Sequence, residues 1–241
     1  MSSRQKYSYG EIFQIIKDFH FFQQNFDPNV DKGILLSEDT TVEEWRMICD
    51  LEKADNLVRI YANLFDIDTE NVDELLIILR SSNSTLRQLC NWLAEKGKRK
   101  YEFLSSSNDY FAVLGKELKK NGSDITEIDF KTSLTSLMKK DAAVIAQTLS
   151  LIQPGSIRSY TFQSPRYSKL YTTISVLLIL LSICLVLTYT KDVLFGLFGV
   201  IGLFLLLIKE NLLPKSYQIN GHETIGGVIN EMIQNQTSNG G

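Results

Sequence analysis

The feature that most constrains this chain is a long stretch without charge in its last third. Between Leu170 and Ile208, only Lys191 and Asp192 are charged. As a helix, the part before these two residues would be about 31 Å long, which matches the hydrocarbon core of a bilayer. The stretch therefore predicts a two-helix transmembrane hairpin over residues 169–209.

The second half of this hairpin leaves two arrangements open. Residues 193–208 would form a helix of about 24 Å, which is short for a full span. Either both helices cross the bilayer, or the pair enters one leaflet as a re-entrant wedge. Basic residues cluster on the open side of the hairpin, and Lys191 alone lies at its tip. The positive-inside rule then predicts a two-pass protein with both termini in the cytoplasm.

Small and hydroxylated residues in the hairpin predict a helix-packing face. Small side chains let membrane helices approach closely, and hydroxyl groups can bond across the contact. The alternative is that glycine is simply frequent in membrane helices. The residues of the predicted packing face are Thr172, Ser175, Ser182, Gly196, Gly199 and Gly202.

The rest of the chain has the composition of a folded domain. The chain has 25 basic and 28 acidic residues, and all but two of them lie outside the apolar stretch. Helical periodicity continues from Tyr9 to about Gln153, a length that can bury a substantial core. We therefore expect a soluble bundle of about six helices over residues 1–153, followed by a linker over 154–168.

Local signals predict where these helices begin and end. Thr41 followed by Glu44 is a capping box, which opens a single long helix through Leu64. A turn at Asp27–Asn29 ends the first helix, and Gly97 ends the fourth. The remaining starts are expected at Tyr9, at Asp68 or Thr69, at Ser84 or Thr85, at Asn108 and at Asp124.

Residues 210–241 form a predicted tail with one amphipathic helix. Apolar residues recur at helical spacing from Ile225 to Ile233. This helix would either dock on the protein or lie at a membrane interface. The expected fold class is thus all-α: a helical bundle, a two-helix transmembrane hairpin and a short amphipathic C-terminal helix.

No pattern in the sequence predicts catalysis, a metal or a cofactor. The three cysteines, Cys49, Cys90 and Cys184, lack metal-ligand spacing. His20 and either Cys49 or Cys90 could form a nucleophile pair, but their coexistence is the only support for one. A net charge of −3 argues against nucleic acid as a partner. We expect a protein that is not an enzyme.

Charge is unevenly divided along the predicted bundle. Residues 27–74 hold 14 acidic and 4 basic side chains, whereas residues 80–140 hold 12 basic and 7 acidic ones. Such a domain can pair head to tail with copies of itself or with a charged partner. Alternatively, the two blocks face each other within one molecule. The candidate interaction patch is the densest basic cluster, Lys96, Lys98, Arg99 and Lys100.

These features favour a membrane-anchored interaction or scaffold protein. Its partners would be the lipid bilayer and a protein, which could be a second copy of the same chain. One alternative is a self-assembling effector that perturbs membranes, as pore-forming or toxin-like proteins do. A further alternative is a membrane-shaping hairpin protein.

Overall fold

The computed structural model describes most of the chain, and its main gaps fall in the last third. The described residues are 5–27, 29–49, 51, 53–101, 104, 106–125, 127–163, 173–181, 201 and 216–239. Internal contacts divide the chain into two units. The first unit comprises Met1–Tyr160 with Ile219–Gly241, and the second comprises Thr161–Gln218.

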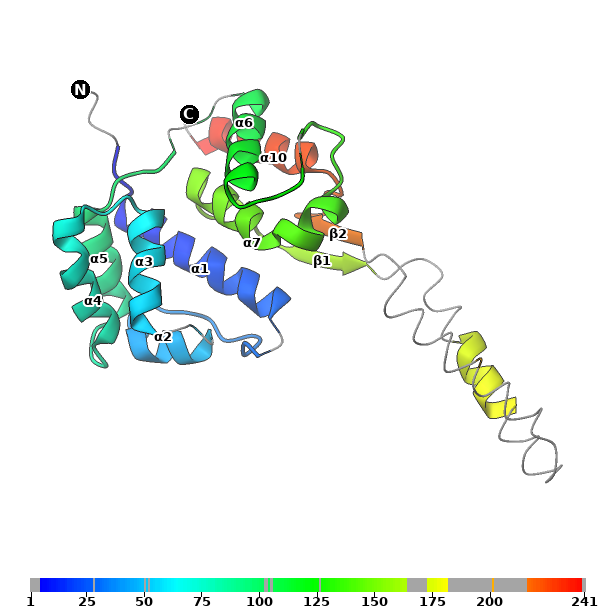
Figure 1. Ribbon diagram of the computed structural model, residues 1–241, viewed down its shortest axis with the longest axis horizontal. Helices are drawn as coiled ribbons and strands as arrows, with labels where there is room; N and C mark the ends of the chain where they lie inside the picture. The colour runs from blue at the N-terminus through cyan, green and yellow to red at the C-terminus, as the bar shows by residue number, and fades with distance from the viewer. Residues whose placement is uncertain are drawn as a thin grey trace. The chain divides into compact units, whose positions relative to one another are not determined.

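Helix α1, Tyr9–Phe26, is the central element of the first unit. It begins where Ser8 and Glu11 form a capping box, and it ends at the predicted turn. Its apolar stripe is buried against α5 (Leu86–Lys96) and α7 (Leu134–Ile152). In Figure 1, α1 lies between the group α2–α5 and the group α6, α7 and α10.

The predicted helix from Thr41 to Leu64 is wrong, because the chain forms two helices there. These are α2, Val42–Ile48, and α3, Ala54–Leu64. The division turns both apolar faces inward, so that the rings of Trp45 and Tyr61 meet edge to face at 5.9 Å. One straight helix could not bring these rings together, because about 24 Å of helix would separate them.

The rest of the N-terminal group follows the predicted signals closely. A short 3-10 turn, Thr69–Asn71, leads into α4, Val72–Arg80. Thr85 caps α5 with a capping box that uses Gln88. Gly97 ends α5 with an extended backbone conformation, and a Cβ at this position would lie 2.5 Å from the Leu93 carbonyl oxygen, so the position needs glycine.

Antiparallel backbone bridges join the residues that precede two pairs of helices. Thr41 and Thr85, the N-caps of α2 and α5, form an antiparallel bridge. Ser133, the N-cap of α7, forms the same kind of bridge with Thr224, which precedes α10 (Ile225–Asn239). Each bridge satisfies backbone groups that helix ends leave without an intrahelical partner.

The C-terminal group packs α6, Ser107–Lys120, against α7 and α10. The helix expected to begin at Asp124 begins instead at Leu134, so that prediction is wrong by ten residues. The Leu134 amide donates to Glu223, and the Ile225 amide donates to Thr132. These bonds to α10 hold the preceding residues as a loop. The local sequence does not indicate these long-range hydrogen bonds.

The amphipathic C-terminal helix docks on the protein. Helix α10 buries Ile225, Val228, Ile229 and Met232 completely. The chain leaves the first unit through β1 (Tyr160–Gln163) and returns to it through β2 (Ser216–Ile219). The two strands form a two-stranded sheet. Asn220 accepts from the Arg158 amide at 2.8 Å and so fastens this return.

The prediction of a transmembrane hairpin is contradicted. Across the described ranges, no helix is both long and apolar enough to cross a membrane. The predicted two-pass localisation with cytoplasmic termini is contradicted with it.

The predicted packing face of the hairpin falls mostly on residues that the structure does not describe. Thr172, Ser182, Gly196, Gly199 and Gly202 lie outside the described residues. Ser175 lies within residues 173–181 and is buried.

Candidate functional site

The predicted basic patch makes ion pairs within the molecule. Lys98 lies 2.7 Å from Asp68, and Lys100 lies 3.3 Å from Glu117. Arg99 is almost fully buried and pairs with Glu11 of α1. Lys96 contacts the neighbouring Glu95. The cluster therefore ties the segment after α5 to α1, to α6 and to the turn after α3.

The acidic and basic blocks of the sequence also meet within one molecule. Arg80 lies 2.5 Å from Asp55, and Arg87 reaches both Glu38 and Asp39. Each of these pairs joins the block 27–74 to the block 80–140. The side chains involved are largely exposed, so each pair stabilises the fold only weakly.

The structure brings His20 and Cys49 together. His20 Nδ1 lies 3.1 Å from Cys49 Sγ, and His20 Nε2 lies 2.8 Å from the Ile34 carbonyl oxygen. Because a carbonyl only accepts, Nε2 carries the proton and Nδ1 accepts from the thiol. Both side chains are buried. Spacing along the sequence, which separates them by 29 residues, gave no sign of this contact.

This pair lacks the properties of an activated nucleophile. Burial raises the pKa of the Cys49 thiol to about 12, and it does the same for Cys90. A catalytic cysteine needs a lowered pKa and access to substrate. Burial also holds the pKa of Tyr61 well above its ordinary value. The pair is therefore a structural contact of a protonated thiol and not an activated nucleophile.

An apolar cavity adjoins this pair between α1, α2, α3 and α7. Its volume is about 210 Å³, and we call it the aromatic pocket. His20 forms part of its wall. The other lining residues are Phe19, Phe22, Gln23, Trp45, Leu51, Leu57, Ile60, Tyr61, Leu64, Ala143, Ala146 and Gln147.

No protein-family model, curated protein or solved structure matches this chain. The candidate sites therefore rest on their own geometry.

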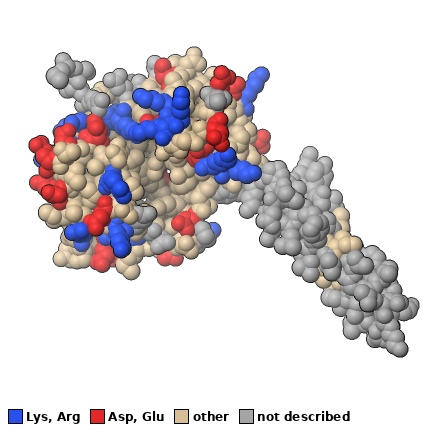
Figure 2. All heavy atoms as spheres, in the orientation of Figure 1, with Lys and Arg blue, Asp and Glu red and all other residues tan. Residues whose placement is uncertain are grey.

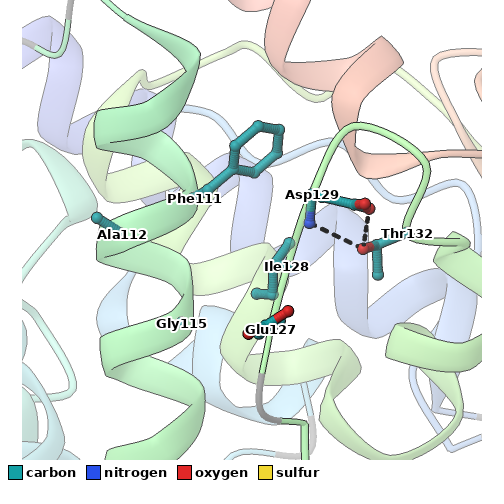
Figure 3. A pocket seen from close by; sticks show the side chains of 7 residues that line it. All are labelled: Phe111, Ala112, Gly115, Glu127, Ile128, Asp129 and Thr132. Carbon is teal, nitrogen blue, oxygen red and sulfur yellow. Dashed lines mark hydrogen bonds between the residues drawn. The ribbon is translucent and has the colours of Figure 1, made fainter.

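A second hollow lies between α6 and the loop before α7. We call it the α6 hollow; it is open and has a volume of about 600 Å³. In Figure 3, Phe111 and Gly115 of α6 face Ile128 and Asp129 of the loop. A Cβ added at Gly115 would meet no atom within 4 Å. The full lining is Phe111, Ala112, Gly115, Glu127, Ile128, Asp129 and Thr132.

The loop that forms one wall of the α6 hollow is held in place by a hydrogen bond within it and by contacts with α6 and α10. The Thr132 hydroxyl donates to Asp129, which holds the pKa of that carboxyl below its ordinary value. The Phe130 ring meets Phe111 edge to face at 5.0 Å. On the other side, a Cβ at Gly226 would lie 2.5 Å from the Phe130 carbonyl oxygen, so α10 needs glycine there.

Neither hollow was predicted from the sequence. The aromatic pocket depends on the break between α2 and α3, and the α6 hollow depends on the loop that was expected to be helical. Phe111, Ala112 and Gly115 share one helix face, which was the one available signal. Among the residues that the structure places, no group of three His, Cys, Asp or Glu could hold a metal ion.

Proposed function

We propose that the first unit is a self-associating interaction module, in which two copies pair through α6. The observation that carries this proposal is the exposed face of α6 beside the α6 hollow. Phe111 is only half-buried there, and Phe130 is 45% exposed. The small residues Ala112 and Gly115 leave room for another helix to approach.

An antiparallel pair of α6 helices fits this face. If a two-fold axis crosses α6 between Ala112 and Gly115, each of these residues faces the other across the axis. Positions 111 and 116 then also face each other. The Phe111 ring of one copy would enter the space beside Gly115 of the second copy. This is the arrangement of a knob in a hole, as in other closely packed helix pairs.

Charge along α6 supports the same orientation. Asp109 lies in its first turn, and Asp129 lines the α6 hollow together with Phe111. Lys116 and Lys119 lie exposed in its second half, and neither pairs with a carboxylate of any described residue. Figure 2 shows basic side chains gathered where Figure 1 places α6 and the preceding segment. An antiparallel copy would bring opposite charges together.

This proposal moves the contact away from the predicted patch. Lys98, Arg99 and Lys100 already pair with carboxylates of their own molecule. Breaking those pairs to form new ones would gain little. Lys116 and Lys119 of α6 would not have to break an ion pair with any described residue. We further propose that the module binds rather than catalyses, which agrees with the protonated state of the Cys49 thiol.

The experiment is sedimentation velocity on the full chain with a matched pair of variants. One helix pair buries less than a standard interface, so we expect a weak dimer, with a Kd on the order of tens of micromolar. Gly115→Leu fills the space that Phe111 would enter and should weaken dimerisation by about tenfold or more. Gly10→Leu is the control, because Gly10 is likewise a helical glycine with no atom within 4 Å of an added Cβ.

Charge provides a second test of the proposal. Lys116→Glu should weaken the dimer, and about 1 M salt should weaken the wild-type dimer, because that salt shortens the Debye length to about 3 Å. Lys32→Glu makes the same charge change at an exposed site away from α6. A monomer at about 100 µM and low salt would contradict the proposal, since that concentration exceeds the expected Kd. So would equal weakening by Gly115→Leu and Gly10→Leu.

A further inference from the structure

The aromatic pocket has features of a ligand site that self-association through α6 does not use. Its walls come mainly from four helices, and six of its thirteen lining residues are buried. Trp45, Leu57 and Tyr61 are each less than 5% exposed. The rings of Trp45 and Tyr61 hold each other edge to face. The cavity is therefore shaped by packed side chains that have little freedom to collapse into it.

The size of the pocket limits what can enter it. A cavity of about 150 Å³ lined by Leu, Ile and Phe is known to remain dry and to bind benzene. The aromatic pocket is larger, at about 210 Å³, but far smaller than a helix needs. It has room for a molecule of one or two fused rings. Its aromatic walls favour flat ligands, because rings stack or meet edge to face at little cost.

The pocket also selects against charge. None of its lining residues is Asp, Glu, Lys or Arg. His20, the one titratable wall residue besides Tyr61, uses both ring nitrogens in hydrogen bonds to Cys49 and Ile34. An ion in this cavity would lose its hydration without gaining a partner, which is strongly unfavourable.

Two carboxamides supply the polar part of the pocket. Gln23 of α1 and Gln147 of α7 both line it and are half-buried. Neither side-chain amide bonds to another residue in the described ranges. Each amide offers one carbonyl acceptor and two N–H donors to a ligand. Ala143, on the same helix as Gln147, also lines the pocket and is exposed, so this part opens to solvent.

We propose that the aromatic pocket binds a small neutral aromatic molecule of one or two rings, with a hydrogen-bonding group at one edge. The rings pack among Phe19, Trp45 and Tyr61, and the polar edge faces Gln23 and Gln147. The site is separate from α6, so it stands or falls independently of self-association.

The test is isothermal titration calorimetry on the full chain with two isosteric probes. Indole has an N–H group that can donate a hydrogen bond to a glutamine carbonyl oxygen, whereas benzofuran has the same shape without that donor. We expect saturable binding of indole, with benzofuran binding about fivefold to tenfold more weakly. No saturable binding of either probe up to about 1 mM would overturn the proposal, because that limit corresponds to a very weak site. Equal affinity for both would overturn the role of the amides.

Variants locate the binding within the molecule. Ala146→Leu places three carbons into the cavity and should abolish binding of both probes. Gln23→Ala and Gln147→Ala together should weaken indole to the affinity of benzofuran and leave benzofuran unchanged. Gln234→Ala, at an exposed position of α10, is the matched control and should change neither. If Ala146→Leu does not fold, the double variant still decides: indole binding unchanged by it would overturn the proposal.

Discussion

The aromatic pocket and the α6 hollow differ in how their walls are made. Four helices meet around the pocket, and its Trp45 and Tyr61 rings belong to the core of the N-terminal group. One helix and one loop border the hollow, and most of its lining is exposed or half-exposed. Where helices converge, the core fixes the shape and leaves a small apolar space. Where a loop replaces a helix, the space is open.

The largest effect that would test this contrast is expected when one aromatic ring is truncated in each region. Trp45→Ala should lower the free energy of unfolding by about 3–5 kcal/mol, because the ring is buried and its neighbours cannot close the space. Phe130→Ala, at a side chain that is 45% exposed, should cost about 1 kcal/mol or less. Urea unfolding of the full chain measures both. Similar losses would show that the loop wall is as tightly packed as the core.

A buried carboxyl gives the second test, through pH. Asp18 of α1 accepts from the Gly155 amide at 2.8 Å, and burial raises its pKa to about 6. The folded protein therefore binds this proton more tightly than the unfolded chain does. Stability should fall as pH rises from about 4 to about 6, by up to about 3 kcal/mol.

Asp18→Asn should remove this dependence on pH, which urea unfolding across the range would measure. Asp129, at the α6 hollow, is the comparison because its pKa is lowered by the hydroxyl of Thr132. Its contribution has the opposite sign, being lost as pH falls. A slope that survives Asp18→Asn would mean that another group is responsible.

The same substitution should have opposite effects at two glycines. A Cβ at Gly97 would lie 2.5 Å from the Leu93 carbonyl oxygen and 3.2 Å from Phe65, so Gly97→Ala should cost about 2 kcal/mol. Gly115 has open space beside it, and Gly115→Ala should stabilise α6 by about 1 kcal/mol, since alanine favours helix. Thermal unfolding of the two variants is the measurement. A loss at Gly115 would mean that the α6 hollow is filled in the folded protein.

The smallest expected effect is at an exposed ion pair between the two charge blocks. Arg80 and Asp55 are each about 60% exposed, so a double-mutant cycle with alanine should give a coupling below about 1 kcal/mol. The coupling should disappear in about 1 M salt. A larger coupling that persists in salt would show that charge, rather than core packing, holds the two blocks together.

Local signals in the sequence predicted many of the helix ends. The capping box at Thr41, the start of a helix at Thr85 (one of the two positions expected) and the end of α5 at Gly97 are confirmed. These predictions succeed because a cap is satisfied by residues three positions away, which the sequence shows directly. The apolar spacing of α10 was also sufficient, and its docking on the protein was one of the two arrangements expected.

The wrong predictions have a shared physical cause. Apolar periodicity continues through Cys49 to Lys53, yet the chain turns there so that Trp45 and Tyr61 can pack together. Residues 124–133 were expected to be helical, but Asp129 and Thr132 bond to each other, Ser133 caps α7, and the Ile225 amide donates to the Thr132 carbonyl oxygen. Uncharged composition over 170–208 predicted a membrane hairpin, whereas no helix among the described residues is long and apolar enough to cross a membrane.

The sequence by itself determined the all-α character, the caps of individual helices and the amphipathic face of α10, because each depends on residues within one or two turns. Tertiary structure decided the rest. The contact between His20 and Cys49, the pairing of the charged blocks and both hollows join residues far apart in the chain. Such contacts depend on which helix faces meet, and packing of the whole core selects those faces.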